Sequence, residues 1–215
     1  MTFTDELWTS TADLRTQIDQ LPFLLALEDG TLPQDRFDHY LAQDARYLAQ
    51  FGRVLAHAAA RSSTTDELLF WTESAANTVR VERALHERHV QHPDETPMSP
   101  TCLAYTSFLL AECATGSYAT IVAAVLPCYW IYDDVGTRLR ERLGDMTGHP
   151  YGDWISTYGD PAFTAATDTA RAMVDAAAGR AGSEDLARMR TAFNSAARFE
   201  YRFWDAAWRT EAWSI

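Results

Sequence analysis

Apolar residues recur at helical spacing along almost the whole chain, and this periodicity restricts the possible folds more than any other feature. Runs that alternate apolar and polar residues between turn signals, which would indicate β-strands, are missing. A chain of this kind buries its apolar faces helix against helix. The sequence therefore predicts an all-α protein, a layered helical bundle.

The interruptions of this periodicity predict where the helices begin and end. Three prolines between His92 and Pro100 each disfavour helix at the preceding residue, so a loop is expected there. Gly144 ends one helix, and acidic residues after Ser183 suit the first turn of another. The expected helices are Thr4–Gln20, Gln34–Ala60, Thr65–His92, Ser99–Thr115, Ser117–Leu143, a short piece at Asp153–Thr157, Ala162–Ala178 and Ser183–Thr210.

The length and composition suit one soluble domain. A chain of 215 residues, 47% of them hydrophobic, can bury a sizeable core, and no repeat or linker divides it, so residues 1–215 are expected to form a single domain. No window is apolar enough to span a bilayer, and the first residues lack the pattern of a secretory signal. A cytoplasmic protein is expected. The net charge of −12 disfavours nucleic acid and anionic membranes as partners.

The sequence disfavours a metal or another cofactor. Cys102, Cys113 and Cys128 contain no CxxC pair, which argues against disulfides and against a cysteine zinc site, and the first two suit the core face of one helix. Glu82 and His86 could reach one ion, but other helices supply no matching set for a diiron centre. Glycine-rich phosphate loops, GxSxG and HExxH are also missing. We therefore expect no cofactor.

One expected helix carries a carboxylate within an aromatic stripe. In YLAQDARYLAQF, Tyr40, Asp44, Tyr47 and Phe51 lie at i, i+4, i+7 and i+11, which places them on one helical face. Burying a carboxylate there is costly unless something binds it. The residues alone leave two explanations open, an internal hydrogen bond to a tyrosine or an arginine and a bound ligand.

The last helix places a second carboxyl among aromatic side chains. Phe193, Glu200 and Trp204 follow helical spacing in the segment that contains RFEYRFWDAAW, so Glu200 should point into the interior. Desolvation would raise its pKa and suit it to move protons near neutral pH. The alternative is a buried ion pair with an arginine such as Arg198 or Arg202.

The stretch LPCYWIYDDVG combines a thiol with a helix-disrupting residue. Pro127 should kink its helix or open a new one, and in the second case Cys128 would lie near the positive helix end, where the pKa of a thiol falls. Tyr132 lies one turn further on. The alternative is that Cys128 is a small buried hydrophobe. Tyr105 needs a hydrogen-bond partner if it is buried, and it could orient an acid.

With these residues assembled, the chain resembles the TenA family, also called thiaminase II, which has the haem-oxygenase-like helical fold. The resemblance extends from about Leu7 to the final EAWS. It is carried by four motifs in the family's order, namely YLAQDARYLAQF, AYTSFLLAECATGSYATIVAAVLPCYWIYDDVG, WISTYGD and FEYRFWDAAWRTEAWS. It implies a homotetramer that needs no cofactor.

The resemblance also implies a reaction. Family members replace the leaving group on the exocyclic methylene of a 4-amino-2-methylpyrimidine by water, which gives 4-amino-5-hydroxymethyl-2-methylpyrimidine. The leaving group is the amine of an aminomethylpyrimidine, in thiamin salvage, or the thiazolium of thiamin. By its motif, Cys128 would be the nucleophile and Glu200 the acid/base at the ring nitrogens. Asp44 would bind the amino group and a ring nitrogen.

The remaining implied contacts come from tyrosines. Tyr105 would orient Glu200, and Tyr132 would help to position the ring. Tyr47 and Tyr158 would offer aromatic surface to the substrate, although Tyr151 lies close enough in the sequence to compete with Tyr158 for that role.

Two other functions stay open on the sequence alone. One is a metal-dependent or other cofactor-dependent oxidase of the same fold, with Glu82 and His86 as ligands. The other is a protein that binds a thiamin-related pyrimidine without turning it over.

Overall fold

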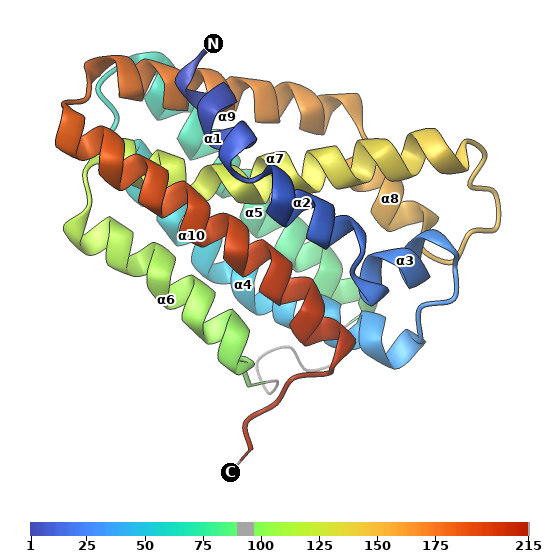
Figure 1. Ribbon diagram of the computed structural model, residues 1–215. Coiled ribbons are helices and arrows are strands. Elements are labelled where there is room, and N and C mark those ends of the chain that lie inside the picture. Colours follow the sequence, from blue (N-terminus) through green and yellow to red (C-terminus); the bar gives the residue numbers. More distant parts are fainter. Residues whose placement is uncertain (90–96, 215) are drawn as a thin grey trace.

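The computed structural model describes the backbone of residues 1–89 and 97–214 and the side chains of residues 1–80 and 97–214. Within these residues the chain is helical and contains no strand, which confirms the predicted all-α class (Figure 1). The helices are α1 (Phe3–Ser10), α2 (Ala12–Asp19), α3 (Pro22–Glu28), α4 (Gln34–Ala60), α5 (Thr65–His89), α6 (Pro100–Thr115), α7 (Tyr118–Leu143), α8 (Gly152–Tyr158), α9 (Pro161–Arg180) and α10 (Ser183–Trp208).

Side chains at the helix starts account for several of these boundaries. Ser99 accepts a hydrogen bond from the amide of Cys102, and Ser117 accepts one from that of Thr120, so each satisfies an amide that the first turn leaves unpaired. Asp160 caps α9 in the same way. These caps place the starts of α6, α7 and α9 within one residue of the predicted positions.

The structure differs from the predicted helices in the first thirty residues. The segment Thr4–Gln20 is not one helix, because Thr11 leaves helical geometry with φ −108° and ψ 11° and separates α1 from α2. Helix α3 was not predicted. It has only seven residues, too few turns for a periodic pattern to appear in the sequence, and Pro22 fixes its first turn. The predicted end at His92 lies outside the described residues.

The long helices pack around one continuous hydrophobic core. Helix α4 packs against α5 and α6, while α7 contacts α8, α9 and α10. In Figure 1, α10 crosses the front of the bundle, α9 lies along its top and α6 along its lower edge. None of the helices in the described part of the chain is long and apolar enough to cross a membrane.

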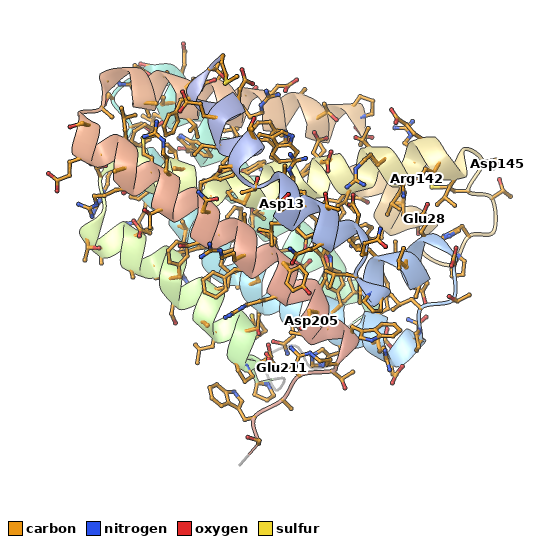
Figure 2. All side chains as sticks on the ribbon, in the orientation of Figure 1. Asp13, Glu28, Arg142, Asp145, Asp205 and Glu211 are labelled. Carbon is orange, nitrogen blue, oxygen red and sulfur yellow. The ribbon has the colours of Figure 1, made fainter. Side chains whose placement is uncertain are left out.

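Stacked side chains hold the short N-terminal helices against the bundle. The rings of Trp8 and Trp130 stack with centroids 4.1 Å apart, and the guanidinium groups of Arg15 and Arg171 cover their outer faces at 3.7 and 4.1 Å. At the opposite end, Arg142 of α7 reaches Glu28 of α3 at 3.2 Å, and Figure 2 shows the pair at the edge of the bundle. These contacts attach α1 and α3 to α7.

Candidate active site

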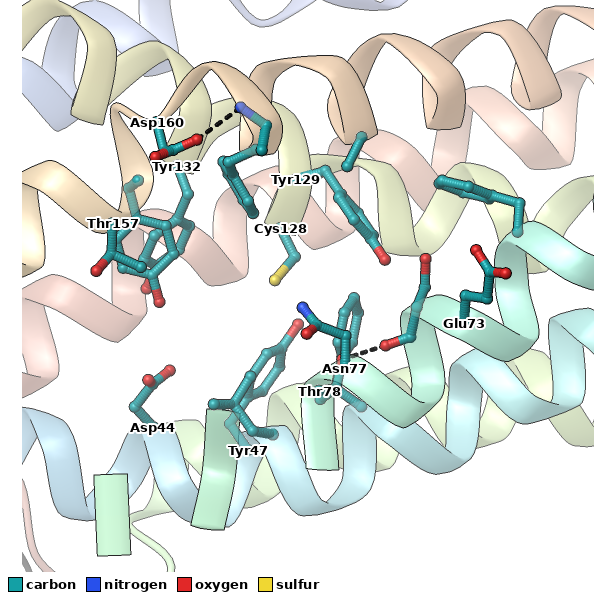
Figure 3. A pocket seen from close by; sticks show the side chains of 18 residues that line it. Asp44, Tyr47, Glu73, Asn77, Thr78, Cys128, Tyr129, Tyr132, Thr157 and Asp160 are labelled. Carbon is teal, nitrogen blue, oxygen red and sulfur yellow. Dashed lines mark hydrogen bonds between the residues drawn. The ribbon is translucent and has the colours of Figure 1, made fainter. Parts of the chain in front are cut away.

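A cavity of about 610 Å³ lies among α4, α5, α7 and the junction of α8 with α9. Asp44 and Tyr47 reach it from α4, Cys128 and Tyr132 from α7, and Tyr158 from the end of α8 (Figure 3). Two helices far apart in sequence and the end of a third therefore bring five of the predicted site residues to one cavity. Such a mostly apolar hollow with a few convergent polar groups is typical of a small-molecule site.

Asp44 is buried at 4% exposure, as the spacing of its aromatic stripe predicted. Burial raises the pKa of its carboxyl from 3.8 to about 7. Within the described residues, neither a tyrosine nor an arginine forms a hydrogen bond or ion pair with this carboxyl. The internal partner that could have explained its burial is thus not seen there, and the carboxyl points into the cavity (Figure 3).

Cys128 presents its sulfur to the cavity from the middle of α7 (Figure 3). Of the two alternatives at Pro127, the opening of a new helix is wrong, because the predicted helix is continuous: α7 begins at Tyr118 and continues through the proline. Cys128 therefore gains nothing from a helix start. Burial, followed by the nearby charge of Glu200, raises the pKa of the thiol well above its ordinary value, and the hydroxyl of Tyr47 opposes this shift.

Glu200, at 2% exposure, does not line the cavity, but its charge acts on the thiol of Cys128, which does. The hydroxyl of Tyr105 donates a hydrogen bond of 2.5 Å to its Oε1. The pKa of Glu200 is raised from 4.5 to about 8. Burial is the main cause of this increase, the hydrogen bond from Tyr105 opposes it, and the charge of Asp44 adds to it. The alternative of an ion pair is wrong for the two arginines named, because Arg198 and Arg202 are exposed and neither pairs with Glu200.

Tyr105, which the family resemblance pairs with Glu200, does not line the cavity. Its ring lies 4.9 Å from that of Tyr47, which separates it from the open space. The hydroxyl of Tyr47 is buried and forms no hydrogen bond of ordinary geometry in the described part of the molecule, but it lies close enough to the thiol of Cys128 to lower the pKa of that thiol. It can therefore bond with the thiol or with a molecule in the cavity.

Hydrogen bonds and ring contacts join the aromatic residues around Tyr132 to one another. The hydroxyls of Tyr40 and Tyr132 are hydrogen-bonded at 3.2 Å, and Nε1 of Trp154 donates to Tyr40 at the same distance. The ring of Tyr132 lies 4.7 Å from that of Tyr158 and 4.8 Å from that of Trp204. These contacts leave little freedom to the rings at this end of the cavity.

Tyr158, and not Tyr151, lines the cavity. The hydroxyl of Tyr151 donates to the carbonyl of Leu32, away from the site. The turn after Tyr158 is held by Arg140, which donates to the carbonyl of Gly159 at 2.6 Å. It also contacts Gly136, where a Cβ would lie 2.4 Å from the carbonyl carbon of Tyr158. A residue without a side chain thus lets α7 approach the helix end that carries Tyr158.

The wall that α5 contributes was not predicted from the sequence; it includes Glu73, Ser74, Asn77 and Thr78. These polar residues recur at i, i+1, i+4 and i+5, a pattern that a solvent-exposed helix face also shows. Tyr129 and Phe163 were missed as well, because apolar and aromatic cavity walls resemble core in a sequence. The sequence alone contains no feature that distinguishes a cavity wall from a solvent-exposed helix face or from the core.

The other two cysteines are buried in the core, as expected. Burial raises the pKa of Cys102 to about 12 and that of Cys113 to about 11. The side chains of Glu82 and His86 lie outside those that the structure describes. Among the described side chains, no three from histidine, cysteine, aspartate and glutamate are grouped so that they could hold a metal ion.

Residues 17–210 match the TENA/THI-4/PQQC family. The chain belongs to this family. Its relatives include the aminopyrimidine aminohydrolase of Bacillus subtilis, which is 36% identical over 90% of this chain and 84% of that protein. The thiamine biosynthesis multifunctional protein ThiED of Corynebacterium glutamicum is 38% identical over 99% of this chain. This chain covers only 28% of that protein and 29% of its Corynebacterium efficiens counterpart.

Solved structures agree with this membership. A TenA homologue from P. horikoshii superposes with a TM-score of 0.86 at 25% identity, over 97% of this chain and 99% of that one. A domain from Shewanella denitrificans described as having a heme oxygenase-like fold gives a TM-score of 0.73 at 14% identity, over 96% of this chain and 92% of that one. The predicted family and the haem-oxygenase-like fold are both confirmed.

Proposed function

We propose that this TenA-family protein is a hydrolase of 4-amino-2-methylpyrimidines that carry a leaving group on the exocyclic methylene. Its product would be 4-amino-5-hydroxymethyl-2-methylpyrimidine, for thiamin salvage, with no cofactor. One observation carries the proposal: a cavity holds the thiol of Cys128 and the carboxyl of Asp44, which has no partner among the described residues, and the charge of Glu200 acts on that thiol. The similarity to an aminopyrimidine aminohydrolase from Bacillus subtilis supports it.

Substrate binding would depend on Asp44. The edge of a 4-aminopyrimidine presents an amino group beside a ring nitrogen, and a carboxyl group can pair with both at once. Such a pair would explain a buried carboxyl that has no partner in the described protein. Tyr47, Tyr132 and Tyr158 would pack around the flat ring.

The reaction would begin with proton transfer from the thiol. Because burial holds the pKa of Cys128 well above its usual range, a neighbouring base must take the proton, and Glu200, with a pKa of about 8, is suited to exchange protons near neutral pH. The thiolate would then add to a ring carbon, and the electron pair displaced from the ring would settle on a ring nitrogen that Glu200 protonates. The ring would lose its aromaticity in this step.

The second half would restore the ring. The electron pair of the enamine-like adduct expels the leaving group from the methylene, water adds to the exposed methylene carbon, and the thiol is released as aromaticity returns. Water thus supplies the hydroxyl of the product. Its other hydrogen leaves on the ammonia when the leaving group is an amine, and as a proton released to solvent when the leaving group is the thiazole of thiamin. Tyr105 would orient Glu200 through these proton transfers.

Product analysis tests the proposal. Purified, metal-stripped protein is incubated separately with aminomethylpyrimidine and with thiamin, and hydroxymethylpyrimidine is measured by chromatography. Product from either substrate supports the hydrolase, and the faster substrate identifies the preferred leaving group. Binding without product would favour a protein that only binds the pyrimidine, and product that appears only after a metal is restored would favour a metal-dependent reaction.

We also propose that residues 1–215 act as one domain, in the cytoplasm, and assemble as a homotetramer. The outward face of α6 supports assembly, because Leu103, Ala104 and Ala111 are exposed there. Light scattering on the purified protein would give the mass, and a monomer would contradict the assembly.

A further inference from the structure

We propose that the end of the cavity beyond Cys128 is a leaving-group subsite that prefers a flat organic cation, and that Glu73 sets this charge preference. The subsite is defined by Phe70, Glu73, Tyr129 and Phe163. The inference rests on the proposed function, because it assumes that the pyrimidine occupies the end beside Asp44.

The cavity extends to both sides of the thiol. Figure 3 shows Cys128 between Asp44, on one side, and Glu73, on the other. A volume of about 610 Å³ lies in the range of pockets that hold drug-sized ligands, so one small ring beside Asp44 leaves space unfilled. The group that departs from the methylene would occupy this remaining space.

The walls of the remaining space are largely aromatic. The rings of Tyr129 and Phe163 are nearly parallel, with an interplanar angle of 13° and centroids 6.3 Å apart. Phe70 of α5 adds a third ring to the same region. Aromatic faces attract flat rings by stacking and attract cations through the ring quadrupole.

The charge of this end is negative. Glu73 is exposed at the cavity rim, and no described residue pairs with it. Asp160 also lies at the rim and accepts from the amide of Ala162 at 2.7 Å, but Figure 3 shows it on the same side of Cys128 as Asp44. Among the described residues that line the cavity, none is basic. Glu73 is therefore the carboxylate available to a cation there.

A binding comparison isolates this contribution. Cys128→Ala protein, in which the bound molecule is not consumed, is titrated with thiamin and with the analogue in which a neutral thiophene replaces the thiazolium. Quenching of tryptophan fluorescence reports both affinities. Cys128→Ser serves as the background if the alanine variant does not fold. The measured quantity is the ratio of the two dissociation constants, which cancels changes in protein stability and in pyrimidine contacts.

Two further variants in that background decide the inference. Glu73→Gln should reduce the preference for the cation by roughly threefold to fivefold, because a carboxylate beside water contributes modestly. Asp66→Asn removes the same charge from an exposed position on α5 that does not line the cavity, so it should leave the ratio unchanged. An unchanged ratio in Glu73→Gln, or an equal loss in Asp66→Asn, would overturn the subsite.

The test separates this inference from the proposed function. Turnover of aminomethylpyrimidine by the wild type, together with an unchanged ratio in Glu73→Gln, would remove only the subsite. Absence of turnover by the wild type, together with a reduced ratio of dissociation constants in Glu73→Gln, would refute the hydrolase and support the cation subsite. If neither compound binds, the subsite is refuted, and the hydrolase is then decided by the turnover of aminomethylpyrimidine alone.

Discussion

The hydroxyl of Tyr105 donates a 2.5 Å hydrogen bond to Oε1 of Glu200, and this bond is what supports the ionised form of a buried carboxyl. The two residues come from α6 and α10, so the pairing depends on how those helices pack. A hydrogen bond to the charged form lowers the pKa of an acid. Tyr105 therefore reduces the increase that burial causes in the pKa of Glu200.

Tyr105→Phe should move the pH dependence of turnover. Without the donor, the pKa of Glu200 should rise by about one unit from about 8, and the limb of the kcat/KM profile that reports Glu200 should shift to higher pH. The rate at neutral pH should fall about tenfold. Tyr201→Phe, on the same helix as Glu200 and without such a bond, is the matched control. An identical shift in both variants would remove the specific role of Tyr105.

Asp44→Ala should weaken binding of the pyrimidine. The lost pair would reduce affinity by about 1–3 kcal/mol, roughly tenfold to a hundredfold, because the amino edge would be left unpaired in the cavity. Calorimetric titration of hydroxymethylpyrimidine into wild type and variant gives the difference. Wild-type affinity in a folded Asp44→Ala protein would show that the carboxyl does not bind this edge.

The two buried carboxyls should make the protein less stable as the pH rises. Burial raises the folded-state pKa of Asp44 to about 7 and that of Glu200 to about 8, whereas the unfolded chain releases both protons near 3.8 and 4.5. Between about pH 4 and pH 8 the folded state binds more protons, so the free energy of unfolding decreases over this window. The contribution of the two protonated carboxyls to the free energy of unfolding is fully present below about pH 4 and is lost above about pH 8.

Asp44→Asn checks this linkage. The amide cannot ionise, so the decrease in unfolding free energy between pH 4.5 and pH 8 should be smaller than in the wild type by on the order of 3 kcal/mol. Urea unfolding at both pH values gives the comparison. Asp66→Asn, an exposed carboxyl, should keep the wild-type decrease. A decrease in Asp44→Asn as large as the wild type's would refute the contribution of Asp44.

Gly136→Ala should disturb the helix end that carries Tyr158. The added Cβ would lie 2.4 Å from the carbonyl carbon of Tyr158 and 2.7 Å from the amide nitrogen of Gly159, so the backbone must shift. We expect a loss of about 1–3 kcal/mol in stability and a raised KM.

Gly179→Ala provides the contrast, because a Cβ there meets nothing within 4 Å in α9. It should stabilise the protein by about 0.5–1 kcal/mol and leave KM unchanged. Thermal unfolding and steady-state kinetics of the two variants give both quantities. Equal effects of the two substitutions would rule out a specific contact at Gly136.

Helical periodicity predicted the elements well where they are long. Helix α4 has the predicted bounds Gln34–Ala60, because its apolar stripe continues over many turns. The same periodicity predicted the burial of Asp44 and Glu200, since each carboxyl occupies a position whose helical neighbours are aromatic. It failed for α3, which has too few turns, but it predicted the helix that continues through Pro127, whose lost hydrogen bond is tolerated within a long packed helix.

The candidate site was predictable only in part. Periodicity assigns a residue to a face of its own helix, but it does not say which helices meet. The packing of Tyr105 behind Tyr47, the choice of Tyr158 over Tyr151, and the wall that includes Glu73 all depend on tertiary contacts. Family motifs supplied candidate residues for the cavity and left the α5 wall unassigned.

The central claim is that the thiol of Cys128 performs the substitution, and a comparison of two cysteine variants tests it most directly. Cys113 is also a thiol without a disulfide, but it is buried in the core away from the cavity. Product formation from aminomethylpyrimidine and affinity for hydroxymethylpyrimidine are measured for Cys128→Ala, Cys113→Ala and the wild type. We predict that Cys128→Ala binds the pyrimidine and forms no product, while Cys113→Ala keeps its turnover. Product formation by Cys128→Ala at the wild-type rate would contradict the account.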